Sequence, residues 1–201
     1  MKILKKIIFE ILYVFIGVVL AFYAQHFIEK NSEKKQTEFI VKTLITDLKK
    51  DLNEISYNIE ILQNSTNTID KAIMNRSFST NQVASITENV LFLHSETAYI
   101  QLSNKGFEII KNNKLRDKII ETYEIQYNYI TTKEKYLWDI HLSTIFNSDF
   151  IHNNGNKSLL TDAEIGKLEL IKNKKIALIK VYKETSVKIK TLLAMLKKYQ
   201  N

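Results

Sequence analysis

The sequence predicts an all-α protein, in which an N-terminal transmembrane helix continues into a bundle of three long helices with several short ones. Its 201 residues include only four Gly and no Pro, too few for the many turns of a β-sandwich or barrel. An apolar run occupies residues 7–28, and apolar side chains recur at helical spacing along much of the remaining chain. The hydrophobic fraction of 45% is typical of a folded protein rather than a disordered one.

A transmembrane helix is expected at residues 7–28, after a basic flank at residues 1–6. Glu10 is the only Asp, Glu, Lys or Arg among these 22 residues, and about 20 residues span a hydrocarbon core of roughly 30 Å. The main alternative is a cleavable signal peptide, but Phe22 stands two positions before Ala24, where a signal peptidase prefers a small residue. A buried core helix is disfavoured because so long an uncharged stretch is unusual in a small domain. An uncleaved anchor is therefore favoured.

Small and polar side chains of this anchor share one face of the helix, within a sector of about 100°. Gly17 and Ala21 have the small-xxx-small spacing that lets two membrane helices approach closely. A carboxylate at the depth of Glu10 is costly unless it is protonated, paired or near the headgroups, so it either packs against another helix or snorkels. The predicted transmembrane packing face comprises Glu10, Val14, Gly17, Ala21, Ala24 and Gln25.

A long helix is predicted to continue from the anchor, because apolar residues recur at alternating steps of four and three from Val41 onward. This stripe suits one helix of an intramolecular bundle, which we favour over a parallel dimeric coiled coil. Thr66 interrupts the stripe within the polar run 64–67, where side chains compete for backbone hydrogen bonds, so a bend is expected there. The predicted helical seam comprises Val41, Ile45, Leu48, Leu52, Ile55, Ile59, Leu62, Ile69 and Ile73.

Short elements are expected in the middle of the chain. A cluster of Ser, Thr and Asn predicts a connection near residues 75–81. A short helix follows at about residues 82–94, and a second one at residues 96–104 ends at Gly106, a residue that suits a left-handed helix stop.

Two further long helices complete the predicted bundle. Asn112 or the next residue caps the first of them, and its apolar residues keep helical spacing to about Phe146. A polar loop is expected near residues 152–160, after which Thr161 and Glu164 form a capping box for the last helix.

Positive charge is concentrated in the last helix. Residues 167–201 hold ten Lys and two acidic residues, whereas the net charge of the whole chain is +7. We expect this basic face to pack against acidic side chains of the first body helix, in preference to anionic lipid or nucleic acid. Few aromatic residues accompany the lysines, so nucleic acid is not an expected partner. The acidic side chains are Asp47, Asp51, Glu54 and Glu60.

No pattern of residues indicates catalysis. The chain has no Cys, which excludes disulfide scaffolds, thiolate nucleophiles and Cys-based metal sites. Its histidines, His26, His94, His141 and His152, lack the spacing of a metal-ligand set, and no phosphate-binding loop or nucleophile elbow occurs. Glu96 lies near His94, but such a pair more often caps a helix or faces solvent than transfers protons. We therefore expect no enzyme, cofactor or metal site.

Two segments carry a family resemblance. In residues 10–21, Glu10, Gly17 and Ala21 stand in a Glu-then-apolar, Ile-Gly, Leu-Ala pattern; the second segment comprises residues 97–102 with Gly106, Ile110, Asn112, Leu115 and Arg116. These resemble the transmembrane signature and the central helix-turn-helix pattern of a family of single-pass bacterial membrane proteins of unknown function. The family usually continues its signature with a polar Asn/Trp cluster, where this chain has Gln25, His26 and Phe27. The resemblance implies an N-terminal anchor and a helical extracytoplasmic domain, and supplies no activity.

Packing is the favoured role of the second segment, with a partner-binding surface as the alternative. Tyr99 and Leu102 are expected to dock the short helix on the bundle, while Gly106 permits the turn. The candidate interaction or packing residues are Thr97, Tyr99, Leu102, Gly106, Leu115 and Arg116.

We expect a single-pass protein of the bacterial inner membrane, with a cytoplasmic N-terminus and an extracytoplasmic bundle at residues 29–201. Lysines flank both ends of the anchor almost equally, but a long C-terminal domain translocates largely regardless of its charge. The expected function is that of a scaffold or interaction subunit in a membrane complex. Its partners are the lipid bilayer and a protein, or a second copy, that contacts the transmembrane helix. The alternatives are a membrane-anchored ligand-sensing module that acts through a partner, and a membrane-disrupting or pore-forming oligomer.

Overall fold

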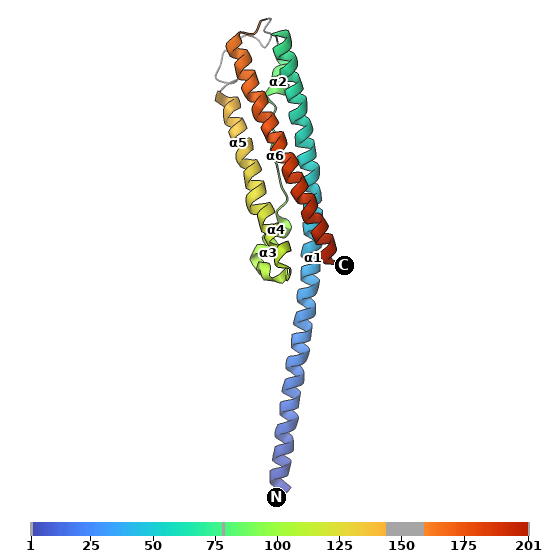
Figure 1. Cartoon of the computed structure of the whole chain (residues 1–201). Coiled ribbons are helices and arrows are strands. Elements are labelled where there is room, and N and C mark those ends of the chain that lie inside the picture. Colours follow the sequence, from blue (N-terminus) through green and yellow to red (C-terminus); the bar gives the residue numbers. More distant parts are fainter. Residues whose placement is uncertain (1, 78, 144–158, 201) are drawn as a thin grey trace.

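The computed structural model describes residues 2–77, 79–143 and 159–200, with the side chains of residues 2–11, 80 and 81 left out. Helices occupy most of this part of the chain and no strand occurs in it, so the predicted all-α class is confirmed. The long helical elements stand side by side as columns, and one helix projects far below the others (Figure 1).

The projecting helix is α1 (Lys2–Asn75), 74 residues without interruption. At about 1.5 Å per residue it is roughly 110 Å long. Its lower half stands alone and its upper half is a wall of the bundle (Figure 1). Large apolar side chains such as Phe15, Leu20 and Phe22 are exposed along the lower half, and burial begins at Ile40. Within the described residues, α1 is the one helix long and apolar enough to cross a membrane.

The bend expected at residues 64–67 is absent, because the hydroxyls there do not disrupt the helix. Thr66 Oγ1 donates to the carbonyl oxygen of Gln63 at 2.8 Å, within the same turn. Ser65 is fully buried and its Oγ donates to the Ile86 carbonyl oxygen at 3.5 Å, which gives it a partner outside the helix. Both side chains stay inside the bundle, and α1 continues unbroken through the polar run.

The first connection follows the prediction, but the helix after it is shorter than expected. α1 ends at Asn75, Arg76 has a left-handed backbone (φ 48°), and α2 spans Thr80–Thr87. Residues 88–96 are not helical. Their burial alternates, with Val90 and Phe92 2% and 3% exposed but Leu91 and Leu93 58% and 70% exposed. This period of two is that of an extended chain, so the prediction of a helix over residues 82–94 was wrong beyond Thr87.

The central turn-rich region agrees with the sequence prediction. α3 (Thr97–Lys105) ends at Gly106, whose φ of 87° lies in the left-handed region that favours glycine. A short 3-10 turn, η1 (Phe107–Ile109), leads to α4 (Asn113–Ile120). Asn112 caps α4 through its Oδ1, which accepts a hydrogen bond from the Leu115 backbone N–H at 3.1 Å.

The second long column is a helix with a π-helical insert. α4 passes directly into the π-helix η2 (Glu121–Tyr127) and then into α5 (Asn128–His141). The predicted end near Phe146 lies outside the described residues, as do most of the loop at 152–160 and His152.

The last column is α6 (Asp162–Gln200), which runs antiparallel to α1. The predicted capping box is present: the Glu164 backbone N–H donates to Thr161 Oγ1 at 3.3 Å, and the Thr161 backbone N–H donates to Glu164 Oε2 at 2.8 Å. Arg76 forms an ion pair with Asp162, and its carbonyl oxygen accepts from the Leu160 N–H at 2.6 Å. These contacts fasten the start of α6 to the end of α1.

The predicted seam of α1 lies inside the bundle of a single chain. It faces α6 and the central segments. From Val41 to Leu62 it belongs to the main core, which Tyr127, Tyr182 and Leu192 also enter from the other columns, whereas Ile69 and Ile73 belong to a second core cluster. Of the seam residues, Val41, Ile45, Leu48, Ile55, Leu62 and Ile69 are buried, and Leu52, Ile59 and Ile73 are half-buried. The stripe that the sequence shows is therefore filled by the chain's own helices.

Candidate functional site

The most unusual feature of the bundle is the extended segment at residues 88–96, which lies among α1, α5 and α6. Inside the described part of the chain its residues belong to no helix and no strand. A buried backbone N–H or C=O needs a hydrogen-bond partner, and here side chains of the surrounding helices supply several of them.

From α1, two carboxylates and an amide hold the segment and the start of α3. Asp51 Oδ1 accepts from the Ser95 backbone N–H at 2.8 Å, and Asp47 Oδ2 accepts from the Ala98 N–H at 3.2 Å. Asn58 Nδ2 donates to the Leu91 carbonyl oxygen at 3.4 Å. These α1 side chains are all nearly inaccessible to solvent, which makes each bond costly to lose.

From the other two columns, Glu134 of α5 and Lys175 of α6 complete the hold. Glu134 Oε1 accepts from the Phe92 backbone N–H at 3.0 Å and from the Tyr182 hydroxyl. Lys175 Nζ donates to the Glu88 carbonyl oxygen at 3.0 Å. One extended segment is thus fastened to all three columns by side chains.

Aromatic rings surround the same segment. Phe92 packs edge-on against Tyr127, with ring centroids 4.9 Å apart, and His94 lies 4.7 Å from the same tyrosine ring. The Tyr127 hydroxyl donates to Asp51 Oδ2 at 2.6 Å. Tyr99 of α3 stacks on Tyr123 at 4.5 Å. The rings close the space around the buried carboxylates and exclude water from them.

Burial controls the protonation of this network. It raises the pKa of Asp51 and of Glu134, and the hydrogen bonds from Tyr127 and Tyr182 offset only part of that effect. Burial, and the nearby carboxylates, also raise the pKa of both tyrosines. Neither of the grooves described below is lined by these four residues. The arrangement is that of an internal fastening: Asp51 and one oxygen of Glu134 accept from the protein's own donors, while Glu134 Oε2 is buried without a partner among the described residues.

Two buried basic side chains lie at the end of the bundle farthest from the exposed half of α1. His141 is 0% exposed, and neither ring nitrogen has a hydrogen-bond partner among the described residues. Burial, together with the charge of Lys175, lowers the pKa of His141 to about 4. Burial lowers the pKa of Lys175 to about 8. His141 is therefore a neutral core residue at physiological pH.

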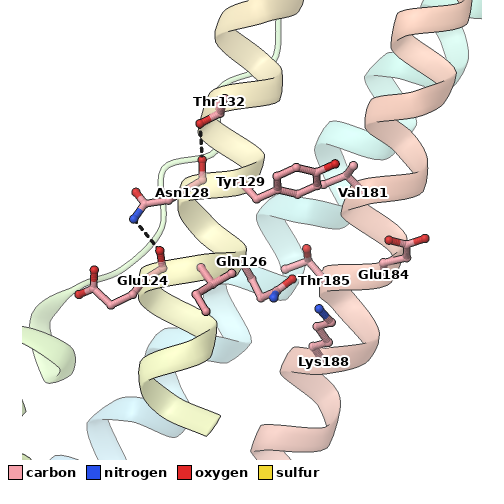
Figure 2. Close-up of a pocket in the computed structure, with 10 residues that line it drawn as sticks. Glu124, Gln126, Asn128, Tyr129, Thr132, Val181, Glu184, Thr185 and Lys188 are labelled. Carbon is pink, nitrogen blue, oxygen red and sulfur yellow. Dashed lines mark hydrogen bonds between the residues drawn. The ribbon is translucent and has the colours of Figure 1, made fainter. Parts of the chain in front are cut away.

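A surface groove of about 480 Å³ lies between η2–α5 and α6. Figure 2 shows Tyr129 reaching from α5 toward Val181 of α6, with Lys188 and Glu184 at the α6 rim. Lys188 Nζ also lies 3.8 Å from a carboxylate oxygen of Glu121 in the π-helix. The lining combines apolar side chains with both signs of charge, which suits binding of an amphipathic ligand or peptide.

The residues of the predicted central motif are brought together, mainly as packing. Leu102 and Leu115 are buried in the main core, and Tyr99 is half-buried against Tyr123 with its hydroxyl donating to Glu124 Oε1 at 2.5 Å. Thr97 is the exposed first residue of α3, Arg116 is half-buried on α4, and Gly106 makes the turn.

The predicted transmembrane face lies on the solitary half of α1. Val14 is exposed, a Cβ added at Gly17 meets nothing within 4 Å, and Gln25 Nε2 donates to Glu29 Oε1 at 3.0 Å. The side chain of Glu10 is outside the described set. Ala21 and Ala24 are also exposed. The structure leaves this face open, and its packing stays a prediction.

One prediction was that lysines of α6 pack on Asp47, Asp51, Glu54 and Glu60. It was wrong for the two buried carboxylates, Asp47 and Asp51. Asp51 accepts from the Ser95 backbone of the extended segment and Asp47 from the Ala98 backbone at the start of α3, because these elements, and not α6, cover that side of α1. The α6 lysines find other carboxylates: Lys172 Nζ lies 2.7 Å from Asp70, and Lys188 pairs with Glu121.

Sequence reasoning missed the residues of the internal fastening, among them Asn58, Glu134, Lys175 and Tyr182. Each looks like an ordinary polar residue on a helix, and the one available signal was the short continuous apolar run Val90–Leu93, which is as typical of a buried extended segment as of a helix. Within the described residues, no group of three His, Asp or Glu side chains is arranged to hold a metal ion.

Comparisons with known proteins give no relative. No family model, no curated protein and no solved structure matches this chain. The resemblance of the two segments to a family of single-pass membrane proteins therefore stays a prediction.

Proposed function

We propose that the protein is a single-pass membrane anchor that carries a helical interaction domain, and that it serves as a scaffold subunit of a membrane complex. The observation that carries this proposal is the continuity of α1. In its lower half, no residue of the apolar candidate membrane span is buried. Its upper half is the central wall of the bundle. Any partner of the membrane segment is thereby linked rigidly to the bundle.

The partner is expected on the transmembrane face that contains Gly17 and Ala21. In lipid, helices associate through close packing of small residues, since burial from water supplies no driving force there. We expect a second copy of this helix, or a helix of another subunit, to contact this face.

Crosslinking tests the partner proposal, because the chain has no native Cys. Single substitutions Val14→Cys, Gly17→Cys and Ala21→Cys should give disulfide-linked dimers in membranes if the partner is a second copy. Leu12→Cys and Val19→Cys, on the opposite side of the helix, serve as matched controls. Equal crosslinking on both sides would contradict self-association through this face, and a heteromeric product would assign the face to another subunit.

Thiol labelling tests the placement of the bundle. Asn75→Cys, at the exposed end of α1, should react with a membrane-impermeant thiol reagent in intact cells as fully as after lysis. Leu20→Cys, within the anchor, should react poorly in both. Protection of Asn75→Cys until lysis would place the bundle in the cytoplasm and contradict the proposed orientation.

A ligand-sensing module is the second candidate, and the groove of Figure 2 favours it. A ligand bound there would contact η2 and α6 together, and α6 lies along α1. A ligand-dependent rise in melting temperature that Tyr129→Ala abolishes would support sensing over a purely structural scaffold.

A further inference from the structure

A second groove, of about 930 Å³, lies where α1 leaves the bundle. One wall is the part of α1 between His26 and Thr37. The other wall is the lower end of the bundle, with Glu108 and Lys111 around η1 and Tyr199 near the end of α6. In Figure 1 the C-terminal end of α6 lies beside α1 at this level.

The position of this groove relative to the membrane follows from helix geometry, and this step rests on the proposed anchor at residues 7–28. The headgroup layer adds about 5–8 Å beyond the hydrocarbon on each side, which corresponds to about three to five helical residues. Residues 29–33 of α1 therefore stand among the headgroups. The α1 wall of the groove includes Glu29, Lys30 and Glu33, so the lower part of the groove opens into that layer.

The charges that line the groove are balanced. Three lysines and three glutamates contribute to it: Lys30, Lys34, Lys111, Glu29, Glu33 and Glu108. A surface of one sign would attract any lipid of opposite charge, whereas a mixed lining complements a headgroup that carries both signs. The contacts these side chains already make, Gln25 to Glu29 and Lys34 to Glu38 at 4.0 Å, are exposed and weak, so a ligand can replace them.

We propose that this groove binds the headgroup of a zwitterionic membrane phospholipid with a primary ammonium group, phosphatidylethanolamine. The lysines would contact the phosphate, and the glutamates would accept hydrogen bonds from the ammonium. A trimethylammonium headgroup cannot donate these bonds, and a glycerol headgroup offers no cation to the carboxylates. Phe27 lies at the membrane side of the groove, where it would contact the start of the acyl chains.

Lipid retention tests the proposal on the full-length chain. The protein is placed in nanodiscs made of equal parts phosphatidylethanolamine, phosphatidylcholine and phosphatidylglycerol, extracted in mild detergent, and its retained lipids are quantified by mass spectrometry. Phosphatidylethanolamine should be enriched over both others. The double variant Glu108→Gln/Lys111→Gln, on the bundle side of the groove, should lower that enrichment by about tenfold.

A matched double variant, Lys49→Gln/Glu60→Gln, removes one charge of each sign from exposed positions higher on α1 and should retain the lipid like the wild type. Equal retention of the three lipids, preference for phosphatidylglycerol, or an unchanged preference in the Glu108→Gln/Lys111→Gln variant would overturn the proposal. Failure of the chain to enter nanodiscs at all would overturn the membrane anchor itself, which is a different result from loss of lipid selectivity.

Discussion

The extended segment at residues 88–96 belongs to no helix or strand, and buried polar side chains provide hydrogen bonds to its backbone. Asp51 and Glu134 each accept from a backbone N–H and from a tyrosine hydroxyl. Replacing any one of these partners by an apolar side chain would leave its counterpart unpaired and buried, at a cost of about 1–3 kcal/mol. The network thus specifies one path for the segment, because other paths would leave these groups buried without hydrogen-bond partners.

The buried His141 makes the free energy of unfolding depend on pH, with a decrease towards acid pH. Its pKa is about 4 in the folded protein and 6.5 in the unfolded chain, so the unfolded chain binds the proton first as the pH falls. The free energy of unfolding therefore falls as the pH drops from 6.5 to 4, and at pH 5 it is about 2 kcal/mol lower than at neutral pH. Above pH 6.5 the histidine is neutral in both states and this effect vanishes.

The substitution His141→Leu should remove that loss. Urea unfolding in detergent at pH 7.5 and pH 5 measures it: the free energy of unfolding should fall less between the two pH values in the variant than in the wild type. Taking this difference cancels the titration of Asp51 and Glu134, which both proteins share. His26→Gln, on the exposed half of α1, should behave like the wild type, and an unchanged pH dependence in His141→Leu would contradict the buried, neutral histidine.

At the scale of elements, two glycines have opposite roles. Gly106 stops α3 with a φ of 87°, and a Cβ there would lie 2.6 Å from Glu108 Oε2. Gly166 lies inside α6, where an added Cβ meets nothing within 4 Å. The first glycine is required by the backbone, whereas the second only weakens its helix.

The two alanine substitutions should therefore change stability in opposite directions. Gly106→Ala should lower the free energy of unfolding by about 1 kcal/mol or more, because alanine is strained at positive φ. Gly166→Ala should raise it by about 0.5–1 kcal/mol, because alanine is the better helix former. Chemical unfolding followed by circular dichroism measures both, and destabilisation by Gly166→Ala would contradict the open helical site.

At the scale of the whole molecule, one continuous helix, α1, joins the proposed membrane segment to the bundle, and we expect the two to move as one body. A helix interrupted at residues 64–67 would let the far end of the bundle swing, but the continuous helix does not. The ion pair of Arg76 with Asp162 and the contacts between α1 and α6 brace its upper half.

Pulsed electron–electron double resonance between spin labels attached at Leu20→Cys and Lys71→Cys tests this rigidity. A continuous helix predicts one narrow distance near 76 Å, from about 1.5 Å per residue. The pair Lys50→Cys and Lys71→Cys, both on the bundle part of α1, should give about 31 Å and serves as the control. A shorter, broad distribution for the first pair with a normal control would indicate a hinge between anchor and bundle.

The sequence by itself determined the helical class, the exposed apolar N-terminal part of α1, the α1 seam, the Gly106 stop, the Asn112 cap and the Thr161–Glu164 box. Each of these depends on residues within one or two helical turns, so periodicity and capping chemistry suffice to read them. Tertiary structure alone decided that residues 88–96 are extended, that α1 is unbroken through residues 64–67, and that Asp51 and Asp47 bond the backbones of this segment and of α3 instead of α6 lysines. The reason is that these outcomes depend on hydrogen-bond partners distant in sequence: the backbone of the segment is satisfied only where three helices present Asn58, Glu134 and Lys175 to it at once.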